Sequence, residues 1–151
     1  MNLDPTLAGG VGGMALLTIT LVAACIFVHF EALDRLNAAI PRLPMRPRFR
    51  VLFLIVSLLL VHSVEIGIFA LGLLIAVSQG GLGHVAGAQD LGLADAIYVS
   101  ATTYTTVGYG DLAPVGAIRL VMGMEALTGF LLLTWSASFT FLEMQRYWQP
   151  R

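Results

Sequence analysis

Three long runs of apolar residues dominate the chain, and short polar segments separate them. The runs cover residues 11–30, 51–77 and 116–141, and charged side chains are rare inside them. A bilayer core about 30 Å thick is crossed by a helix of roughly 20 mostly apolar residues, so each run is long enough for one crossing. The pattern predicts an all-α membrane protein.

A fourth apolar segment, residues 93–105, is too short to cross a bilayer as a helix and too apolar for an exposed loop. It follows a glycine-rich stretch at 79–93 that is typical of a loop. We expect a half-helix that enters the membrane and returns. Asp95 falls in its first turn, where the positive end of the helix dipole favours an acidic side chain.

Composition agrees with a membrane protein and excludes several other classes. Of all residues, 58% are hydrophobic and 11% are charged, the formal net charge is -1, and the single cysteine, Cys25, cannot form an intramolecular disulfide. This balance gives no argument for nucleic-acid binding. We identify no nucleophile, general base or cofactor motif, so we expect neither an enzyme nor an organic cofactor.

Arginine is distributed unevenly about the three runs. One side of the predicted membrane carries only Arg119, whereas the other side carries Arg35, Arg42, Arg46, Arg48, Arg50, Arg146 and Arg151. Basic residues in short loops favour the cytoplasmic side. We therefore expect the N-terminus outside, the linker and C-terminal tail inside, and, because no basic residue precedes the first run, a retained first helix rather than a cleaved signal.

Between the half-helix and the last run lies the segment Thr106-Val107-Gly108-Tyr109-Gly110. Non-helical backbone at membrane depth must be surrounded by protein or line a watery path, because unpaired carbonyl groups are costly in lipid. Glycine adopts left-handed backbone angles at little cost, and its alternation here can turn successive carbonyl oxygens to one side. Such oxygens, with the Thr106 hydroxyl, can replace the water shell of a monovalent cation.

Residues 105–111, Thr-Thr-Val-Gly-Tyr-Gly-Asp, resemble the selectivity filter of potassium channels, and Asp111 and Pro114 also fall where bacterial members have them. The resemblance implies a homotetramer in a prokaryotic plasma membrane, with K⁺ as the permeant ion. It implies K⁺ binding along the filter, at Thr106, Val107, Gly108, Tyr109 and Gly110.

The resemblance also implies a division of the chain. The pore domain would cover 51–147, with an outer helix at 51–78, an outer loop at 79–93, a pore helix at 94–105, the filter at 106–110 and an inner helix at 116–145. Residues 1–30 would form an additional N-terminal transmembrane helix, 31–50 a basic cytoplasmic linker and 146–151 a short cytoplasmic tail. On the inner helix, Gly129 is a hinge candidate, with close helix packing as the alternative, and Phe141 is a candidate hydrophobic constriction.

The chain departs from the family pattern behind the filter. Some bacterial channels carry a glutamate and a tryptophan there that brace the filter, and the matching positions in this sequence are Thr102 and Val99, with Tyr98 beside them. A threonine hydroxyl cannot supply the same charged brace. We therefore expect filter inactivation to differ, with Asp111 kept as a supporting residue.

Two acidic residues fall inside apolar runs, where charges are costly and usually functional. From its depth, we expect Glu125 to hydrogen-bond behind the filter to pore-helix hydroxyls such as Thr102 or Thr103. Glu65 lies three residues after His62 and can share its helix face, which fits a mutually satisfied structural pair or, alternatively, a pH-sensing pair. His29 and His84 have no evident partners, so the sequence predicts no metal site outside the filter.

Other functions are compatible with parts of the pattern. The chain could form a weakly selective monovalent cation channel or a non-conducting subunit of a larger membrane assembly. It could also be a subunit of a potassium transporter, although such proteins normally join four divergent pore loops in one chain and this chain has one.

Overall fold

The computed structural model describes residues 5–78 and 83–148. In chain order its elements are α1 (Pro5–Ala39), a 3₁₀ turn (Ile40–Arg42), α2 (Pro47–Ser78), β1 (Gly83–Ala86), α3 (Leu93–Tyr104), β2 (Ala113–Gly116) and α4 (Ile118–Trp148). Within these described residues, three helices are long and apolar enough to cross a membrane, over Gly12–Arg42, Pro47–Ser78 and Ile118–Arg146. The prediction of an all-α membrane protein with three spanning helices is confirmed.

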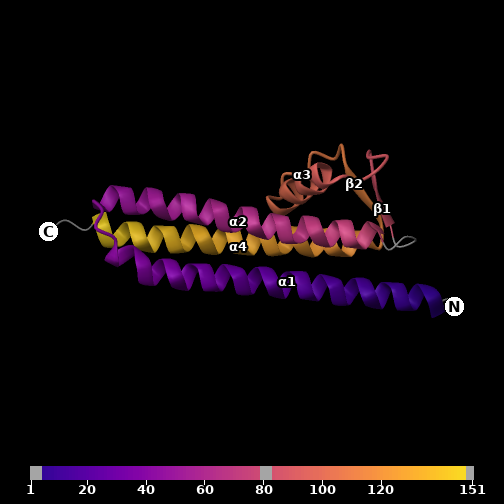
Figure 1. Ribbon diagram of the computed structural model, residues 1–151, viewed down its shortest axis with the longest axis horizontal. Helices are drawn as coiled ribbons and strands as arrows, with labels where there is room; N and C mark the ends of the chain where they lie inside the picture. Colours follow the sequence, from indigo (N-terminus) through magenta and orange to yellow (C-terminus); the bar gives the residue numbers. More distant parts are fainter. Residues whose placement is uncertain (1–4, 79–82, 149–151) are drawn as a thin grey trace.

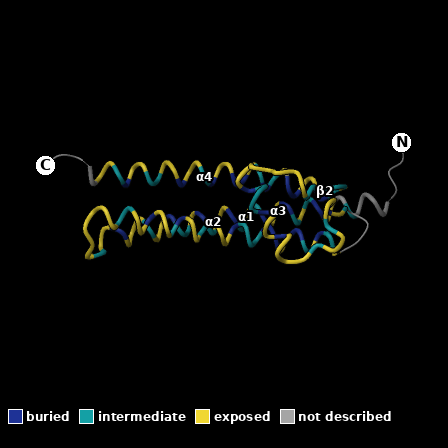
Figure 2. Tube along the Cα trace, turned by 90° about the horizontal axis from the view of Figure 1, so that it is seen from above, coloured by how far each residue is buried: buried dark blue, intermediate teal, exposed yellow. Residues whose placement is uncertain are grey.

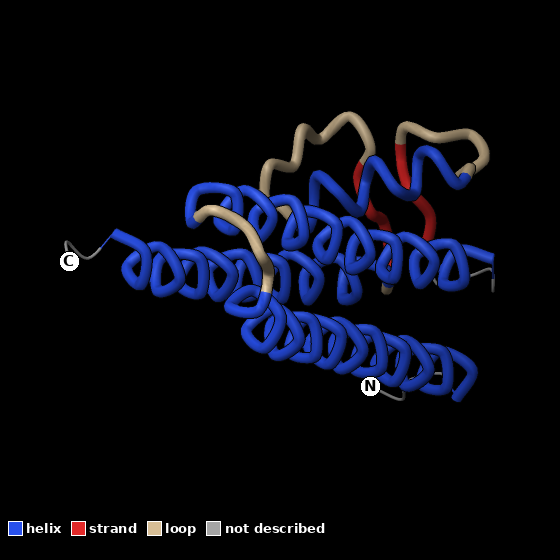
Figure 3. Tube along the Cα trace, turned by 60° about the vertical axis from the view of Figure 1, so that its left-hand side comes forward, coloured by secondary structure: helices blue, strands red, loops and turns tan. Residues whose placement is uncertain are grey.

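The three long helices lie side by side, and the short elements gather near one end (Figure 1). Helix α3 packs against both α2 and α4, while α1 contacts the same two helices. Figure 3 shows that α3 and the strands lie on one side of the α2–α4 pair and α1 on the other. The first helix is therefore an addition to a unit made of α2, α3 and α4.

The helices share one apolar core, and a smaller cluster lies at the end where α1 joins α2. Helix α1 meets α2 closely at Gly72, where an added Cβ would lie 2.3 Å from a methyl group of Leu21. Much of the remaining apolar surface is uncovered in the single chain, as along α4 in Figure 2. In a membrane protein such surface faces lipid or other subunits.

Much of the linker expected at 31–50 is helical. Helix α1 continues to Ala39 and α2 begins at Pro47, which leaves only a short bent connection between them. An exposed i,i+4 ion pair between Glu31 and Arg35, 2.9 Å apart, accompanies the extension of α1. Pro41 ends the α-helix because it lacks an N–H group, whereas Pro47 suits a first helical turn for the same reason.

Three other boundaries shift by a few residues. Helix α3 begins at Leu93, α4 begins at Ile118 rather than 116, and α4 runs to Trp148, so the predicted tail at 146–151 starts inside a helix. The remaining tail positions, 149–151, lie outside the described residues.

Residues 83–86 and 113–116 form a two-stranded antiparallel sheet that the sequence did not reveal. Strand β1 pairs with β2 in a register that runs from Gly83 opposite Gly116 to Ala86 opposite Ala113. Beyond the pairing, Gly87 approaches so closely that an added Cβ would lie 2.2 Å from the carbonyl oxygen of Asp111. The sheet thus attaches the segment that follows α2 to the segment that follows Gly110.

Candidate functional site

The backbone after α3 turns out of the helix in two steps. The N–H group of Thr106 donates to the carbonyl of Thr103 at 2.9 Å, and that of Gly108 donates to the carbonyl of Thr102 at 3.0 Å. Thr102 and Thr103 therefore support residues 106–108 through their main-chain oxygens. The segment is anchored to the C-terminal end of α3 and then leaves it.

Every second residue of this segment has a positive φ. The values are 59° at Thr106, 50° at Gly108 and 82° at Gly110. The two glycines were expected to adopt such angles, and no neighbouring atom lies within 4 Å of an added Cβ at either position, so backbone conformation rather than space favours glycine.

Thr106 was not expected to adopt this conformation. A β-branched residue with positive φ is a genuine outlier, with a cost of about 1–3 kcal/mol, and such strain is concentrated at functional sites. No sequence signal could have revealed it, because threonine normally avoids this region. With Thr106, positive φ recurs at every second residue from 106 to 110.

The side chains of the segment are uncovered in the single chain. Val107 is 55% exposed and Tyr109 is 73% exposed, although both are large and apolar or aromatic. The described part of the chain therefore leaves one face of this segment without a packing partner.

Tyr98 supports the far end of the segment. Its hydroxyl donates to the two carboxylate oxygens of Asp111 at 2.9 Å and 3.1 Å, and its ring stacks on Tyr109 with centroids 6.5 Å apart. The hydrogen bond to Asp111 raises the pKa of Tyr98, so the phenol stays protonated and remains a donor.

The residue of α3 that hydrogen-bonds to Asp111 is Tyr98, one position before the residue that was matched to the family's tryptophan. Val99, which was matched to the family's tryptophan, is 1% exposed and belongs to the core. The hydroxyl of Thr102 donates to the Val99 carbonyl at 3.0 Å, so it is satisfied within α3. Tyr98 occupies the face of α3 that turns towards Asp111.

Glu125 has a partner on α3, but a different one from those predicted. Its carboxyl group is 1% exposed and is hydrogen-bonded to the hydroxyl of Ser100, not to Thr102 or Thr103. Glu125 contacts a hydroxyl of the pore-helix segment, as predicted, but the hydroxyl belongs to a different residue of α3. On α3, Thr102 points about 160° away from Ser100 and Thr103 about 60° away, and of these three residues Ser100 is the one that is hydrogen-bonded to Glu125.

Glu65 lies in a second buried cluster. The Nδ1 atoms of His29 and His62 each lie 2.9 Å from a carboxylate oxygen of Glu65, and the Tyr104 hydroxyl donates to the same carboxylate at 2.5 Å. The predicted contact between His62 and Glu65 is present. The expectation that His29 lacks partners is wrong, because α1 carries it to α2; His84 is exposed on β1.

The inner-helix candidates differ in their surroundings. At Gly129 the backbone of α4 passes so close to α3 that an added Cβ would lie 2.1 Å from the carbonyl oxygen of Tyr104. This contact corresponds to the close-packing alternative, and α4 is continuous through it.

Phe141 is 60% exposed on α4, as expected for a side chain that meets another subunit or a pore. The hinge and constriction roles stay predictions.

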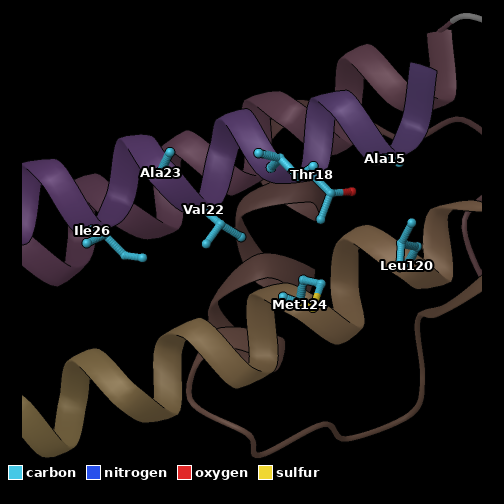
Figure 4. Close-up of a pocket in the computed structure, with 8 residues that line it drawn as sticks. Ala15, Thr18, Val22, Ala23, Ile26, Leu120 and Met124 are labelled. Carbon is cyan, nitrogen blue, oxygen red and sulfur yellow. The ribbon is translucent and has the colours of Figure 1, made fainter. Parts of the chain in front are cut away.

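A pocket of about 400 Å³ opens between α1 and α4 (Figure 4). Its wall is formed by Ala15, Thr18, Ile19, Val22, Ala23, Ile26, Leu120 and Met124. The one hydroxyl among them, that of Thr18, already donates to the Met14 carbonyl at 2.7 Å. The pocket therefore has no polar group that could orient a polar ligand, and it is separate from the segment at 106–110.

Comparison with known proteins places this arrangement in a family. A family model described as "Ion channel" matches residues 51–146, which include α2, α3, the alternating segment and most of α4. A segment of 40 residues is 42% identical to protein LctB of Bacillus caldotenax, and one of 40 residues is 45% identical to protein LctB of Geobacillus stearothermophilus. Each match covers 26% of this chain and 30% of the relative.

No solved structure matches the chain. The family model, in contrast, covers well over half of the 151 residues and spans the half-helix together with the two helices that flank it. The description of this family is that of a channel rather than of an enzyme. The chain belongs to the ion channel family.

Proposed function

We propose that this protein is the subunit of a potassium-selective channel in which four copies surround one pore. The observation that carries the proposal is the alternation of positive φ at Thr106, Gly108 and Gly110 in a Thr-Val-Gly-Tyr-Gly segment. Alternating backbone angles of this kind allow successive carbonyl oxygens to face one axis. Rings of such oxygens replace the hydration shell of K⁺ in channel filters.

The exposed face of the segment supports a tetramer. One chain contributes a single strand of carbonyl groups, whereas a cage around an ion needs several strands related by a closed rotation axis. Val107 and Tyr109 are exposed in the single chain, and neighbouring subunits would cover them. K⁺ would then bind at Thr106, Val107, Gly108 and Tyr109.

The same axis would place α4 around an inner cavity. Phe130 and Phe141 are exposed by 55% and 60% and lie eleven residues apart, close to three turns, so they share one face of α4. That face would line the inner part of the pore, with Phe141 as the constriction. Gly129, which packs on α3, would be the point about which the lower part of α4 bends.

Charge supports one orientation in the membrane. The connection between α1 and α2 lies at the same end of the molecule as the C-terminus, as Figure 1 shows, and this end carries most of the arginines. By the positive-inside rule that end would be cytoplasmic. The strands and the segment at 106–110 would then face the outside.

Ion flux from reconstituted protein tests the proposal. Purified full-length protein in K⁺-loaded vesicles should form a tetramer, release K⁺ well ahead of Na⁺, and be blocked by Ba²⁺. Gly108→Ala strains a backbone with φ of 50° in the filter and should abolish selective flux, whereas Gly123→Ala, where the space around the Cβ is open, should retain it.

Two results would contradict the proposal. Equal K⁺ and Na⁺ flux from a stable tetramer would indicate a weakly selective cation channel. A stable tetramer without any flux, under the ionic conditions that support other channels in the same vesicles, would indicate a non-conducting subunit.

A further inference from the structure

A buried cluster of potential metal-ligand side chains, none of them part of the segment at 106–110, lies where α1 meets α2. It consists of His29 on α1 and His62 and Glu65 on α2, and one potential ligand atom from each lies within 4.8 Å of the others. His29 and Glu65 are fully buried, and His62 is 8% exposed. The proposed conduction path does not use any of these three side chains.

The donor types suit a first-row divalent metal. Two imidazoles and one carboxylate form a known three-ligand set for Zn²⁺, and imidazole is also a good ligand for Cu, Ni and Fe. Both histidines present Nδ1 to the carboxylate, at 2.9 Å from Oε1 for His29 and from Oε2 for His62. Shifts on the order of 1 Å would bring all three donors to the roughly 2.0–2.2 Å at which zinc binds nitrogen and oxygen.

Supporting hydrogen bonds are already in place for each ligand. The Tyr104 hydroxyl donates to Glu65 Oε2. The Ser136 hydroxyl lies 3.0 Å from Nε2 of His62 and 3.5 Å from Nε2 of His29. Histidines that bind a metal through one ring nitrogen characteristically donate the other N–H to an oxygen, and ligating carboxylates are hydrogen-bonded in turn.

The count of protons at Ser136 shows that two neutral imidazoles do not satisfy every hydrogen-bonding atom of the cluster. If both imidazoles are neutral and donate Nδ1–H to Glu65, two Nε2 lone pairs face one hydroxyl, which has a single proton to give. If a cation sits at the Nδ1 atoms, both Nε2 atoms carry a proton, and the two lone pairs of the Ser136 oxygen accept them. The contacts around Ser136 and Glu65 therefore require one more positive charge than two neutral imidazoles supply, either an additional proton or a metal cation.

The charge of Glu65 needs compensation as well. Its depth in a membrane helix makes an uncompensated carboxylate costly. Among the residues that the structure describes, its ion-pair partners are His29 and His62, which are charged only when protonated. A divalent cation neutralises the carboxylate without requiring either imidazole to be protonated.

From these contacts we propose that His29, His62 and Glu65 bind one divalent transition-metal ion, with zinc as the representative of the class. The ion joins α1 to α2. Through the hydrogen bond from Tyr104 to Glu65, it also fixes the last residue of α3, two positions before Thr106. The metal therefore fastens the additional N-terminal helix to the base of the filter.

Zinc binding to the full-length protein tests the proposal. Protein purified in detergent and stripped with a chelator is titrated with Zn²⁺ alone, and bound zinc is measured after removal of free metal. We expect one zinc per chain. His29→Gln and His62→Gln, which keep an amide capable of hydrogen bonding, should weaken binding by at least about tenfold, as expected when a contact of a metal site is lost.

His84→Gln is the matched control, because His84 is exposed on β1 and should not affect zinc content. Co²⁺ in place of zinc should give visible ligand-field absorption in the unmodified protein and not in the double variant His29→Gln, His62→Gln. This spectrum provides a test even if single variants fold poorly.

Two results would overturn the proposal. One is an unmodified, folded protein that retains no zinc above the level of the double variant, which would mean that an additional proton rather than a metal completes the cluster. The other is equal zinc content in all variants, which would mean binding elsewhere. Neither measurement uses ion flux. A protein without a zinc site could therefore still conduct K⁺, and a protein that does not conduct K⁺ could still bind zinc.

Discussion

One hydroxyl group, that of Ser100, connects three helices. It is hydrogen-bonded to the main-chain carbonyl of Ile66 on α2 at 2.8 Å and to the carboxyl group of Glu125 on α4. Ser100 is fully buried and Glu125 is 1% exposed, so water does not readily replace either contact. The stability of the unit formed by α2, α3 and α4 should therefore depend on this residue.

Replacement of Ser100 by alanine tests that dependence. Ser100→Ala leaves the Glu125 carboxyl group buried without its partner, and we expect the free energy of unfolding to fall by about 1–3 kcal/mol. The measurement is thermal or denaturant unfolding of the purified protein in detergent. Ser138→Ala is the control, because that exposed hydroxyl bonds only to the Thr134 carbonyl of its own helix. Equal stability of the two variants would show that the Ser100–Glu125 contact contributes little.

At the scale of elements, the crossing of α3 and α4 positions the segment at 106–110. Helix α4 passes the C-terminal end of α3 at Gly129, and the carbonyl oxygen of Tyr104 lies where a Cβ would be. The same end of α3 is bound to Glu65 on α2 through the Tyr104 side chain. The segment at 106–110 therefore begins two positions after a residue that contacts two spanning helices.

Gly129→Ala should push α3 and α4 apart where they cross. The added methyl group would overlap the Tyr104 carbonyl, which is main chain and cannot rotate away, so we expect a loss of about 1–3 kcal/mol in unfolding free energy. Gly123→Ala, on the same helix with no atom within 4 Å of the new Cβ, should be neutral or more stable by up to about 1 kcal/mol. If Gly129→Ala proved as stable as Gly123→Ala, close packing would not explain this glycine.

At the scale of the whole molecule, the distribution of arginine predicts which end faces the cytoplasm. Cysteine replacement can test this because the native Cys25 is fully buried and should not react. Arg48→Cys and Gln89→Cys introduce exposed thiols at opposite ends of the spanning helices. In intact cells, a membrane-impermeant maleimide should label Gln89→Cys and should label Arg48→Cys only after permeabilisation. The reverse pattern would mean that the orientation is inverted.

Several features of this protein could be predicted from local sequence. The three spanning helices follow from the length of their apolar runs, because the thickness of a bilayer sets the number of residues needed for a crossing. The half-helix follows from a segment that is too short to cross. The left-handed angles at Gly108 and Gly110 follow from the freedom of glycine. In each case the physical cause acts within a few residues.

Other features depend on how the elements pack. The pairing of β1 with β2 joins segments about thirty residues apart, and the partner of Glu125 is Ser100 because of the rotation of α3 about its axis. His29 meets Glu65 only because α1 packs against α2 at one particular depth. Apolar periodicity shows which residues can enter a membrane but not which helix faces meet there. The tertiary structure alone decided these contacts, because they depend on the relative position of helices distant in the chain.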